Sequence, residues 1–190
     1  MKILSAFIML FLYPRKMRLP RPKLSSRMLT FIEHAVIGAP FWDVCCDHGY
    51  VGIKALETRL FPVVHFVDQV PHIMDRLKTL IEQSREGSLH SHYFLYSSSG
   101  EDLEENVEGT LLIAGVGGLT IKTILESLIN KDKLKAQRLL LSPHTDERVL
   151  VDYMSNENFK TLYRPTEKIL IPEGKRHRPL YLLDLKVGQA

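Results

Sequence analysis

Two short apolar runs that break into tight loops constrain this sequence more than any other feature. The first, residues 41–46, leads into Asp47-His48-Gly49-Tyr50, and the second, residues 111–114, leads into Gly115-Val116-Gly117-Gly118. A helical pattern follows each loop. Parallel sheets present backbone N–H groups to a ligand in this way, at the carboxyl ends of their strands. The two loops therefore predict an open sheet with a nucleotide-type binding site.

The order of the remaining patterns indicates how that sheet is built. Strand and helix alternate five times along the chain, which favours parallel strands with right-handed crossovers. The expected strands are 41–46, 63–67, 92–96, 111–114, 138–141, 159–171 and 180–187, and the expected helices are 24–36, 50–59, 71–85, 119–129 and 146–156. The sequence thus predicts an α/β, Rossmann-like, doubly wound sheet of seven strands, mostly parallel with an antiparallel C-terminal edge strand.

Composition limits the class of protein further. With 190 residues, 45% hydrophobic and 25% charged, the chain can bury the core of one domain. Its only cysteines, Cys45 and Cys46, are adjacent, and this geometry disfavours a disulfide, so a reducing, cytoplasmic location is expected. Consecutive strand residues point to opposite faces and no second ligand cluster follows, so no metal site is expected at residues 45–48.

The N-terminal residues form a segment of their own, and we divide the chain into an extension, 1–22, and a domain, 23–190. Residues 3–13 are apolar but fall short of the roughly 20 residues of a membrane span, and no small-residue cleavage site follows. A start at Met17, or a helix that packs on the domain or on a second subunit, is preferred over a targeting segment. Residues 15–27 are basic without an acid, which fits a phosphate-contacting arm or a solvated leader.

Three acidic positions suit a ligand at the strand ends. Asp43 ends the first strand, where its carboxylate can reach an amine directly or through water. Asp47 and His48 lead into a helix N-terminus, which favours an anion. Asp68 ends the second strand, where such folds place the acid that accepts both ribose hydroxyls. Asp68 can also cap the helix that begins at Pro71, and the two roles are compatible.

Two later loops complete the predicted site. Glu101 and Asp102 follow the third strand, where an adenine amino group is often bound, although solvated acids are also common in loops. Gly115, Gly117 and Gly118 allow close backbone approach and positive φ. The alternative for these glycines is a plain strand-to-helix turn.

Four blocks of the chain resemble one family of enzymes. Residues 23–29 resemble the family's opening helix, and 43–50 resemble its Asp-Ile-Gly-Ser-Asp-His-Ala-Tyr block. Residues 113–118 are similar to its Ile-Ala-Gly-Met-Gly-Gly, and 138–143 to its Arg-Leu-Ile-Leu-Gln-Pro. Over about residues 23–187, the chain resembles class I S-adenosylmethionine-dependent methyltransferases, in particular the bacterial tRNA (adenine-N1) methyltransferases that act on the D-arm adenine.

This resemblance implies S-adenosylmethionine as the cofactor and tRNA as the partner, with the protein a monomer or a homodimer. We assign Asp47 and His48 to catalysis, because a carboxylate would stabilise the positive charge that methylation leaves on the base. The acceptor base would be flipped out and could stack on Tyr50 or His144. The predicted substrate-binding residues are Lys23, Arg27, Tyr50 and His144. The predicted cofactor-binding residues are Asp43, Cys45, Gly49, Asp68, Gln69, Glu101, Asp102, Ala114, Gly115, Gly117 and Gly118.

The chain also departs from the family pattern. Cys45 stands where the family has glycine, His144 stands where it often has asparagine, and residues 99–103 only approximate its Gly-Asp-Gly-Leu. We expect the family's helical coiled-coil extension to be absent, since the sequence stops near residue 190. Two alternatives therefore stay open: a methyltransferase for small molecules, and a degenerate methyltransferase fold that serves as an RNA-binding or partner module.

Overall fold

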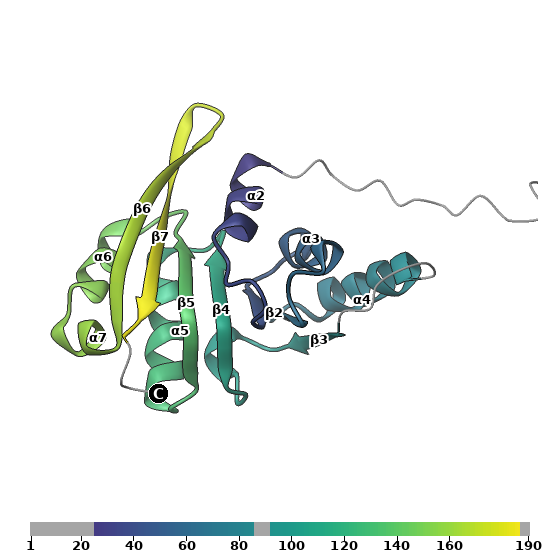
Figure 1. The fold of residues 1–190 in the computed structure, drawn as a ribbon, viewed down its shortest axis with the longest axis horizontal. Coiled ribbons are helices and arrows are strands. Elements are labelled where there is room, and N and C mark those ends of the chain that lie inside the picture. Colours follow the sequence, from purple (N-terminus) through teal and green to yellow (C-terminus); the bar gives the residue numbers. More distant parts are fainter. Residues whose placement is uncertain (1–24, 86–91, 187–190) are drawn as a thin grey trace, which may run out of the picture.

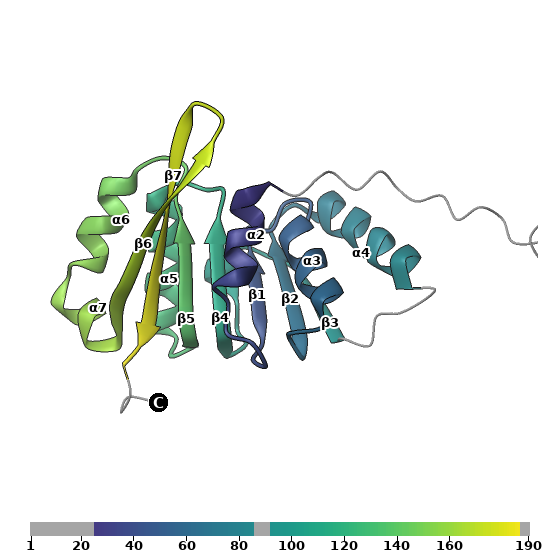
Figure 2. The same cartoon turned by 45° about the horizontal axis from the view of Figure 1, so that its top comes forward.

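One mixed sheet organises the molecule, in a computed structural model that describes residues 25–85 and 92–186 (Figures 1 and 2). Its strand order is β3-β2-β1-β4-β5-β7-β6, and β7 runs antiparallel to both its neighbours. The predicted fold class is therefore confirmed. Lys23 and the expectations for residues 1–22 lie outside the described residues.

The strands follow the predicted order. They are β1 (Phe41–Val44), β2 (Val63–Asp68), β3 (His92–Ser97), β4 (Val107–Ala114), β5 (Leu134–Ser142), β6 (Tyr163–Glu173) and β7 (Arg176–Leu185). The helices are α2 (Ser26–Glu33), α3 (Tyr50–Thr58), α4 (Pro71–Arg85), α5 (Gly118–Asn130), α6 (Glu147–Met154) and α7 (Glu157–Leu162), with one 3-10 turn, η1 (Gly100–Asp102). The sheet thus lies between two groups of helices, α2 to α4 and α5 to α7 (Figure 2).

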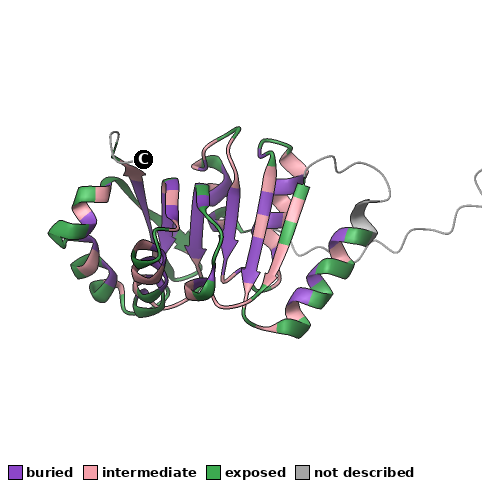
Figure 3. Ribbon diagram, turned by 90° about the horizontal axis from the view of Figure 1, so that it is seen from below, coloured by how far each residue is buried: buried purple, intermediate pink, exposed green. Residues whose placement is uncertain are grey.

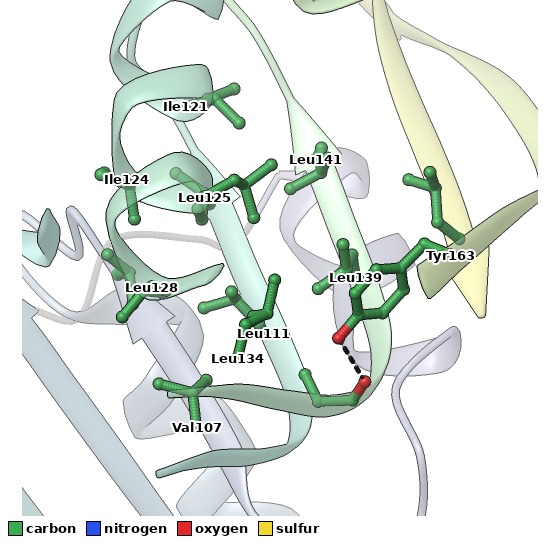
Figure 4. Close-up of a cluster of buried hydrophobic side chains, with 14 of the residues drawn as sticks. Val107, Leu111, Ile121, Ile124, Leu125, Leu128, Leu134, Leu139, Leu141 and Tyr163 are labelled. Atoms are coloured by element: carbon green, nitrogen blue, oxygen red, sulfur yellow. Dashed lines mark hydrogen bonds between the residues drawn. The ribbon is translucent and has the colours of Figure 1, made fainter. Parts of the chain in front are cut away.

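Each face of the sheet packs on its helices through a separate apolar cluster. Side chains of α2, α3 and α4 pack on Phe41 and Phe66, whereas α5, α6 and α7 pack on Leu111 and Leu139. Tyr163 belongs to the second cluster and donates its hydroxyl hydrogen to the carbonyl of Ala136 at 2.8 Å (Figure 4). In Figure 3 the central strands are buried and the outer helix surfaces are exposed, as expected for a doubly wound sheet.

Several element boundaries differ from the predictions for physical reasons. β1 ends at Val44, not at residue 46, because Cys45 has a left-handed φ of 58°. β4 and β5 begin at Val107 and Leu134, four residues before their predicted starts. Gly109, at φ 75°, accompanies a register shift in that part of β4, which hides the strand pattern.

The C-terminal part contains a helix that the sequence pattern did not indicate. Residues 159–162 were predicted as strand but belong to α7, whose first turn is capped by the side chain of Asn156. Pro172 and Glu173 continue β6, so the turn that joins the last two strands lies at Gly174 and Lys175. Since β7 pairs with both β5 and β6, the edge of the sheet is formed by β6.

Candidate active site

A pocket of about 730 Å³ lies at the carboxyl ends of β1, β2 and β4, and α2 and the end of β6 contribute to its wall. This volume is within the range of small-molecule sites. Most of the predicted site residues line it: Arg27, Asp43, Cys45, Asp47, His48, Tyr50, Asp68, Gln69, Glu101, Ala114, Gly115 and His144. The fold therefore brings together residues from six separate segments of the chain.

Four predicted residues do not line this pocket. Asp102 is exposed on η1. Gly49 precedes α3, and a Cβ there would lie 2.7 Å from the side chain of Leu77. A Cβ on Gly117 would meet Thr145 and Asp146, and one on Gly118 would lie 2.2 Å from the Asp146 carbonyl. These last two glycines allow the start of α5 to approach the loop after β5.

In the loop after β1, every second residue has a left-handed backbone conformation. Cys45, Asp47 and Gly49 have φ angles of 58°, 48° and 67°. Left-handed backbone costs about 1–2 kcal/mol for a residue with a Cβ. Two backbone–backbone hydrogen bonds help to hold the loop, from the N–H of Cys46 to the Val67 carbonyl and from that of Gly49 to the Cys46 carbonyl. Cys45 thus adopts the glycine-like conformation that this loop requires.

Asp43 is the most deeply buried acid of the pocket. It is 5% exposed, and its Oδ2 accepts the N–H of Gly52 at 2.9 Å. Burial raises the pKa of Asp43 to about 7, and the nearby charge of Asp68 adds to this effect. Gly52 makes the approach of α3 possible, since a Cβ there would lie 2.2 Å from the ring of Phe66.

Asp68 ties two loops together. Its Oδ2 accepts the N–H of Asp47 at 2.9 Å, and its Oδ1 accepts the N–H of Val70 at 3.0 Å. The bond to Val70 closes the turn before α4, but Val70 precedes the helix, so this bond does not cap an N–H group of α4 itself. Each carboxylate oxygen can accept a further bond. Asp68 can therefore organise the loops and still bind a hydroxyl in the pocket.

Acidic groups dominate this end of the pocket. The pKa of the Cys45 thiol is raised to about 12, first by burial and then by the charges of Asp68, Asp43 and Glu101. The thiol is therefore protonated at neutral pH, and a cationic ligand would be attracted here.

Asp47 and His48 form a pair at the rim. The Nδ1 atom of His48 lies 2.6 Å from Oδ1 of Asp47, and 69% of the Asp47 side chain is exposed. The rings of His48 and Tyr50 are 5.5 Å apart between centroids and tilted by 45°. The two predicted catalytic residues thus lie beside a residue predicted to contact the substrate.

The opposite end of the pocket is basic and lies against β5 and β6. Arg27 donates from Nη2 to the carbonyl and hydroxyl oxygens of Ser142, at 3.2 and 3.0 Å. Its Nη1 lies 2.7 Å from Nε2 of His144 and 3.5 Å from Glu173. Arg178 donates to Glu173 at 2.9 Å and to the His144 carbonyl at 2.9 Å. Two of the predicted substrate-binding residues, Arg27 and His144, therefore contact each other.

Sequence reasoning missed several residues of the pocket wall. Met28 and Phe31 of α2, Thr120 of α5 and Glu173 of β6 line it. Thr120 lies two residues after Gly118, in the first turn of α5, and could have been included on that ground. The apolar spacing of α2 indicated a buried face but not what the face covers. Glu173 lies next to the β6–β7 turn, and nothing in the neighbouring sequence indicates that it lines the pocket.

Among residues 25–85 and 92–186, no group of three or more potential metal ligands occurs. None of the helices in the described part of the chain has the length and apolar character that a membrane crossing requires.

Known proteins share this fold. Bacillus subtilis TrmK, an M1A22 tRNA methyltransferase, is 23% identical, with a TM-score of 0.73 over 86% of this chain and 67% of that one. M. capricolum TrmK, solved with S-adenosyl-homocysteine, is 19% identical, with a TM-score of 0.67 over 85% and 68%. A Streptococcus agalactiae protein of the NADB-Rossmann superfamily is 20% identical, with a TM-score of 0.70 over 86% and 69%. At these identities the likeness concerns the fold.

No curated protein has a sequence that matches this chain. The sequence profile described as "Methyltransferase domain" matches residues 24–177 and so covers most of the chain, including every residue of the pocket wall. The chain belongs to the methyltransferase-domain family.

Proposed function

We propose that this protein transfers the methyl group of S-adenosylmethionine to N1 of an adenine in tRNA. The observation that carries the proposal is the pocket itself, in which the acids Asp43, Asp68 and Glu101 lie at one end and the Asp47–His48 pair lies at the rim. The structural likeness to TrmK proteins supports tRNA as the substrate.

The pocket suits this cofactor on chemical grounds. S-adenosylmethionine carries a methyl group on a cationic sulfonium, together with an amine and a ribose diol. The acids at the strand ends would attract the cationic groups, with Asp43 nearest the floor. The remaining lone pairs of Asp68 would accept the ribose hydroxyls. At Gly115 a Cβ would meet nothing within 4 Å, so that side of the pocket is open to a ligand.

The residues at the rim would act on the acceptor base. The N1 lone pair needs no general base, so positioning supplies most of the rate acceleration. Asp47 would accept a hydrogen bond from the exocyclic amine and stabilise the positive charge that develops on the ring. His48 would orient that carboxylate through its 2.6 Å contact. Tyr50 and His144 also line the pocket and would contact the flipped-out base.

The remaining predictions belong to this proposal. Residues 23–190 would form the catalytic domain, and the protein would act in the cytoplasm on tRNA, as a monomer or a homodimer. Arg27 would be a positioning residue, since it is 7% exposed and holds His144.

Nucleoside analysis tests the proposal most directly. Bulk tRNA from a host that lacks the modification is incubated with the protein and S-adenosylmethionine, digested, and analysed by mass spectrometry for 1-methyladenosine. We expect this product with wild-type protein and a loss of at least about a hundredfold in rate with Asp47→Ala. Asp102→Ala is the control, because Asp102 is acidic, exposed and outside the pocket wall.

Cofactor titration separates the alternatives. If calorimetry detects no binding at millimolar S-adenosylmethionine, both enzyme hypotheses fail and a binding module remains. Binding without methylation of any tRNA nucleoside would indicate a small-molecule acceptor. If Asp47→Ala methylates as fast as wild type, the role assigned to Asp47 is wrong.

A further inference from the structure

The last two strands form a ribbon that leaves the sheet beside the pocket. β7 pairs with β5 only as far as Leu141 and Tyr181, whereas its pairing with β6 continues to Glu173 and Arg176. Residues 170–180, which we call the ribbon, therefore have no third strand. Figures 1 and 2 show the ribbon projecting past the carboxyl ends of β4 and β5.

The base of the ribbon is anchored in the core. Ile171 is 3% exposed and Leu180 is fully buried, and both belong to the cluster that includes Phe31 of α2. Burial of these two branched apolar side chains stabilises the base of the ribbon against the sheet and α2. The ribbon therefore has a defined direction relative to the pocket.

The tip of the ribbon is strongly basic. Lys175, Arg176 and His177 are consecutive and exposed. Within the described residues, neither Lys175 nor Arg176 forms a salt bridge. The nearest acid in sequence, Glu173, is already paired with Arg178 at 2.9 Å and with Arg27 at 3.5 Å. No acid among residues 25–85 and 92–186 therefore forms a salt bridge with these two cations at the tip.

Two features connect the ribbon to the pocket wall, one a register pairing and the other a hydrogen bond. Glu173 lines the pocket and stands directly opposite Arg176 across the ribbon. Arg178 donates to the carbonyl of His144, another residue of the pocket wall. Strand residues two apart share a face, so Arg176 and Arg178 lie on the same face as buried Leu180, the face that packs on α2. Arg176 thus points to the side of the sheet on which Arg27 borders the pocket.

We propose that the ribbon tip, through Lys175 and Arg176, binds backbone phosphates of the RNA whose base enters the adjacent pocket. This inference rests on the proposed function and adds the surface that holds its substrate. Exposed, unpaired cations are the groups that contact phosphates, and such contacts position a nucleic acid without reading its sequence. Because the tip is tied to the pocket wall, phosphates bound there would set how the base approaches Asp47.

The competing explanation is that the cations only keep an exposed hairpin soluble, as lysines often do near sheet edges. A salt titration separates the two explanations, because only bound phosphates release counterions. Affinity for unmodified tRNA is measured between about 0.05 and 0.2 M salt for wild type and for Lys175→Gln/Arg176→Gln. The matched control is Arg76→Gln/Lys78→Gln on α4, where both cations are exposed and form no salt bridge within residues 25–85 and 92–186.

For the ribbon variant we expect roughly tenfold weaker tRNA binding at about 0.1 M salt and a plot of log affinity against log salt that is shallower by about two. The KM for tRNA rises while kcat and the affinity for S-adenosylmethionine stay at wild-type values. The α4 variant should behave as wild type in all five measurements.

Equal effects in the two variants, or no effect in either, would overturn the ribbon proposal while leaving the methyltransferase function intact. If the wild-type chain binds S-adenosylmethionine but neither binds nor methylates tRNA, the proposed substrate is wrong and the ribbon proposal falls with it. Thermal unfolding of each variant shows whether the substitutions leave the fold unchanged.

Discussion

Nη1 of Arg27 lies 2.7 Å from Nε2 of His144, and the arginine side chain is almost completely buried. A guanidinium has only donors, so Nε2 of His144 accepts this bond and the ring hydrogen is on Nδ1. The pKa of His144 is lowered by its partial burial and by the charges of Arg27 and Arg178, while Glu173 opposes them. His144 is therefore a neutral imidazole with one fixed tautomer at the edge of the pocket.

Arg27→Met should raise the pKa of His144, because it removes the nearest positive charge and frees Nε2 to take a proton. Glu173→Gln should shift the same pKa in the opposite direction, since Glu173 raises it. Proton NMR titration of the His144 ring measures both shifts. A pKa of His144 that does not change in Arg27→Met would contradict the tautomer assignment.

The stability of the ligand-free protein should fall as pH rises from about 4 to about 7, through Asp43. Burial raises the folded-state pKa of this carboxyl to about 7 from its ordinary 3.8. In that interval the folded protein holds a proton that the unfolded chain has lost, so raising the pH favours unfolding. Urea unfolding at several pH values should show a flatter profile for Asp43→Asn. An unchanged profile would mean that Asp43 is already ionised at pH 5.

Binding of S-adenosylmethionine should depend on Asp68. In Asp68→Ala the pocket loses an acceptor for the ribose hydroxyls, and the N–H groups of Asp47 and Val70 lose their partner. Hydrogen bonds to charged groups contribute about 1.5–3 kcal/mol, so calorimetry should show about tenfold to a hundredfold weaker binding. Asp102→Ala should bind as wild type. If both variants bind the cofactor with wild-type affinity, Asp68 only stabilises the two loops through its hydrogen bonds and does not bind the ribose.

Gly118→Ala should destabilise the fold, because its Cβ would lie 2.2 Å from the backbone carbonyl of Asp146. The start of α5 would have to move from the loop that carries His144, at a cost of about 1–3 kcal/mol. Denaturant unfolding measures the change. Leu119→Ala is the control, because Leu119 is the next residue and is 55% exposed. Its expected effect is within about 0.5 kcal/mol.

Cys45→Gly should leave stability within about 1 kcal/mol of wild type. Glycine removes the left-handed strain at φ 58°, which stabilises the folded state by about 1–2 kcal/mol. Two opposing effects destabilise it, because glycine increases the entropy of the unfolded chain and the packing of the thiol is lost. Cofactor affinity should not fall, because the loop geometry is retained. A tenfold weaker affinity for S-adenosylmethionine in this variant would show that the cysteine side chain itself contributes to binding.

The local sequence pattern predicts the ends of an element correctly when the residues that specify those ends lie within the element. α4 was predicted with both its ends correct, because apolar spacing and a first-turn proline lie inside the helix. The helix at 157–162 was missed because it is only six residues long and its cap, Asn156, is followed by residues that also fit a strand. In short segments the packing of Phe159 decides the conformation, and sequence periodicity does not report that packing.

The sequence by itself determined the alternation of strands and helices. It also determined that the acidic residues at the strand ends lie together, because right-handed crossovers bring the carboxyl ends of parallel strands to one edge of the sheet. Which residues form the basic end of the pocket was decided only by the tertiary structure. Arg27 meets His144 across 117 residues and Glu173 across 146. Such contacts arise where α2, β5 and the β6–β7 pair converge, and no local pattern encodes a pairing at that separation. The same holds for Gly117 and Gly118, whose close neighbours at 145–146 became visible only once α5 was packed.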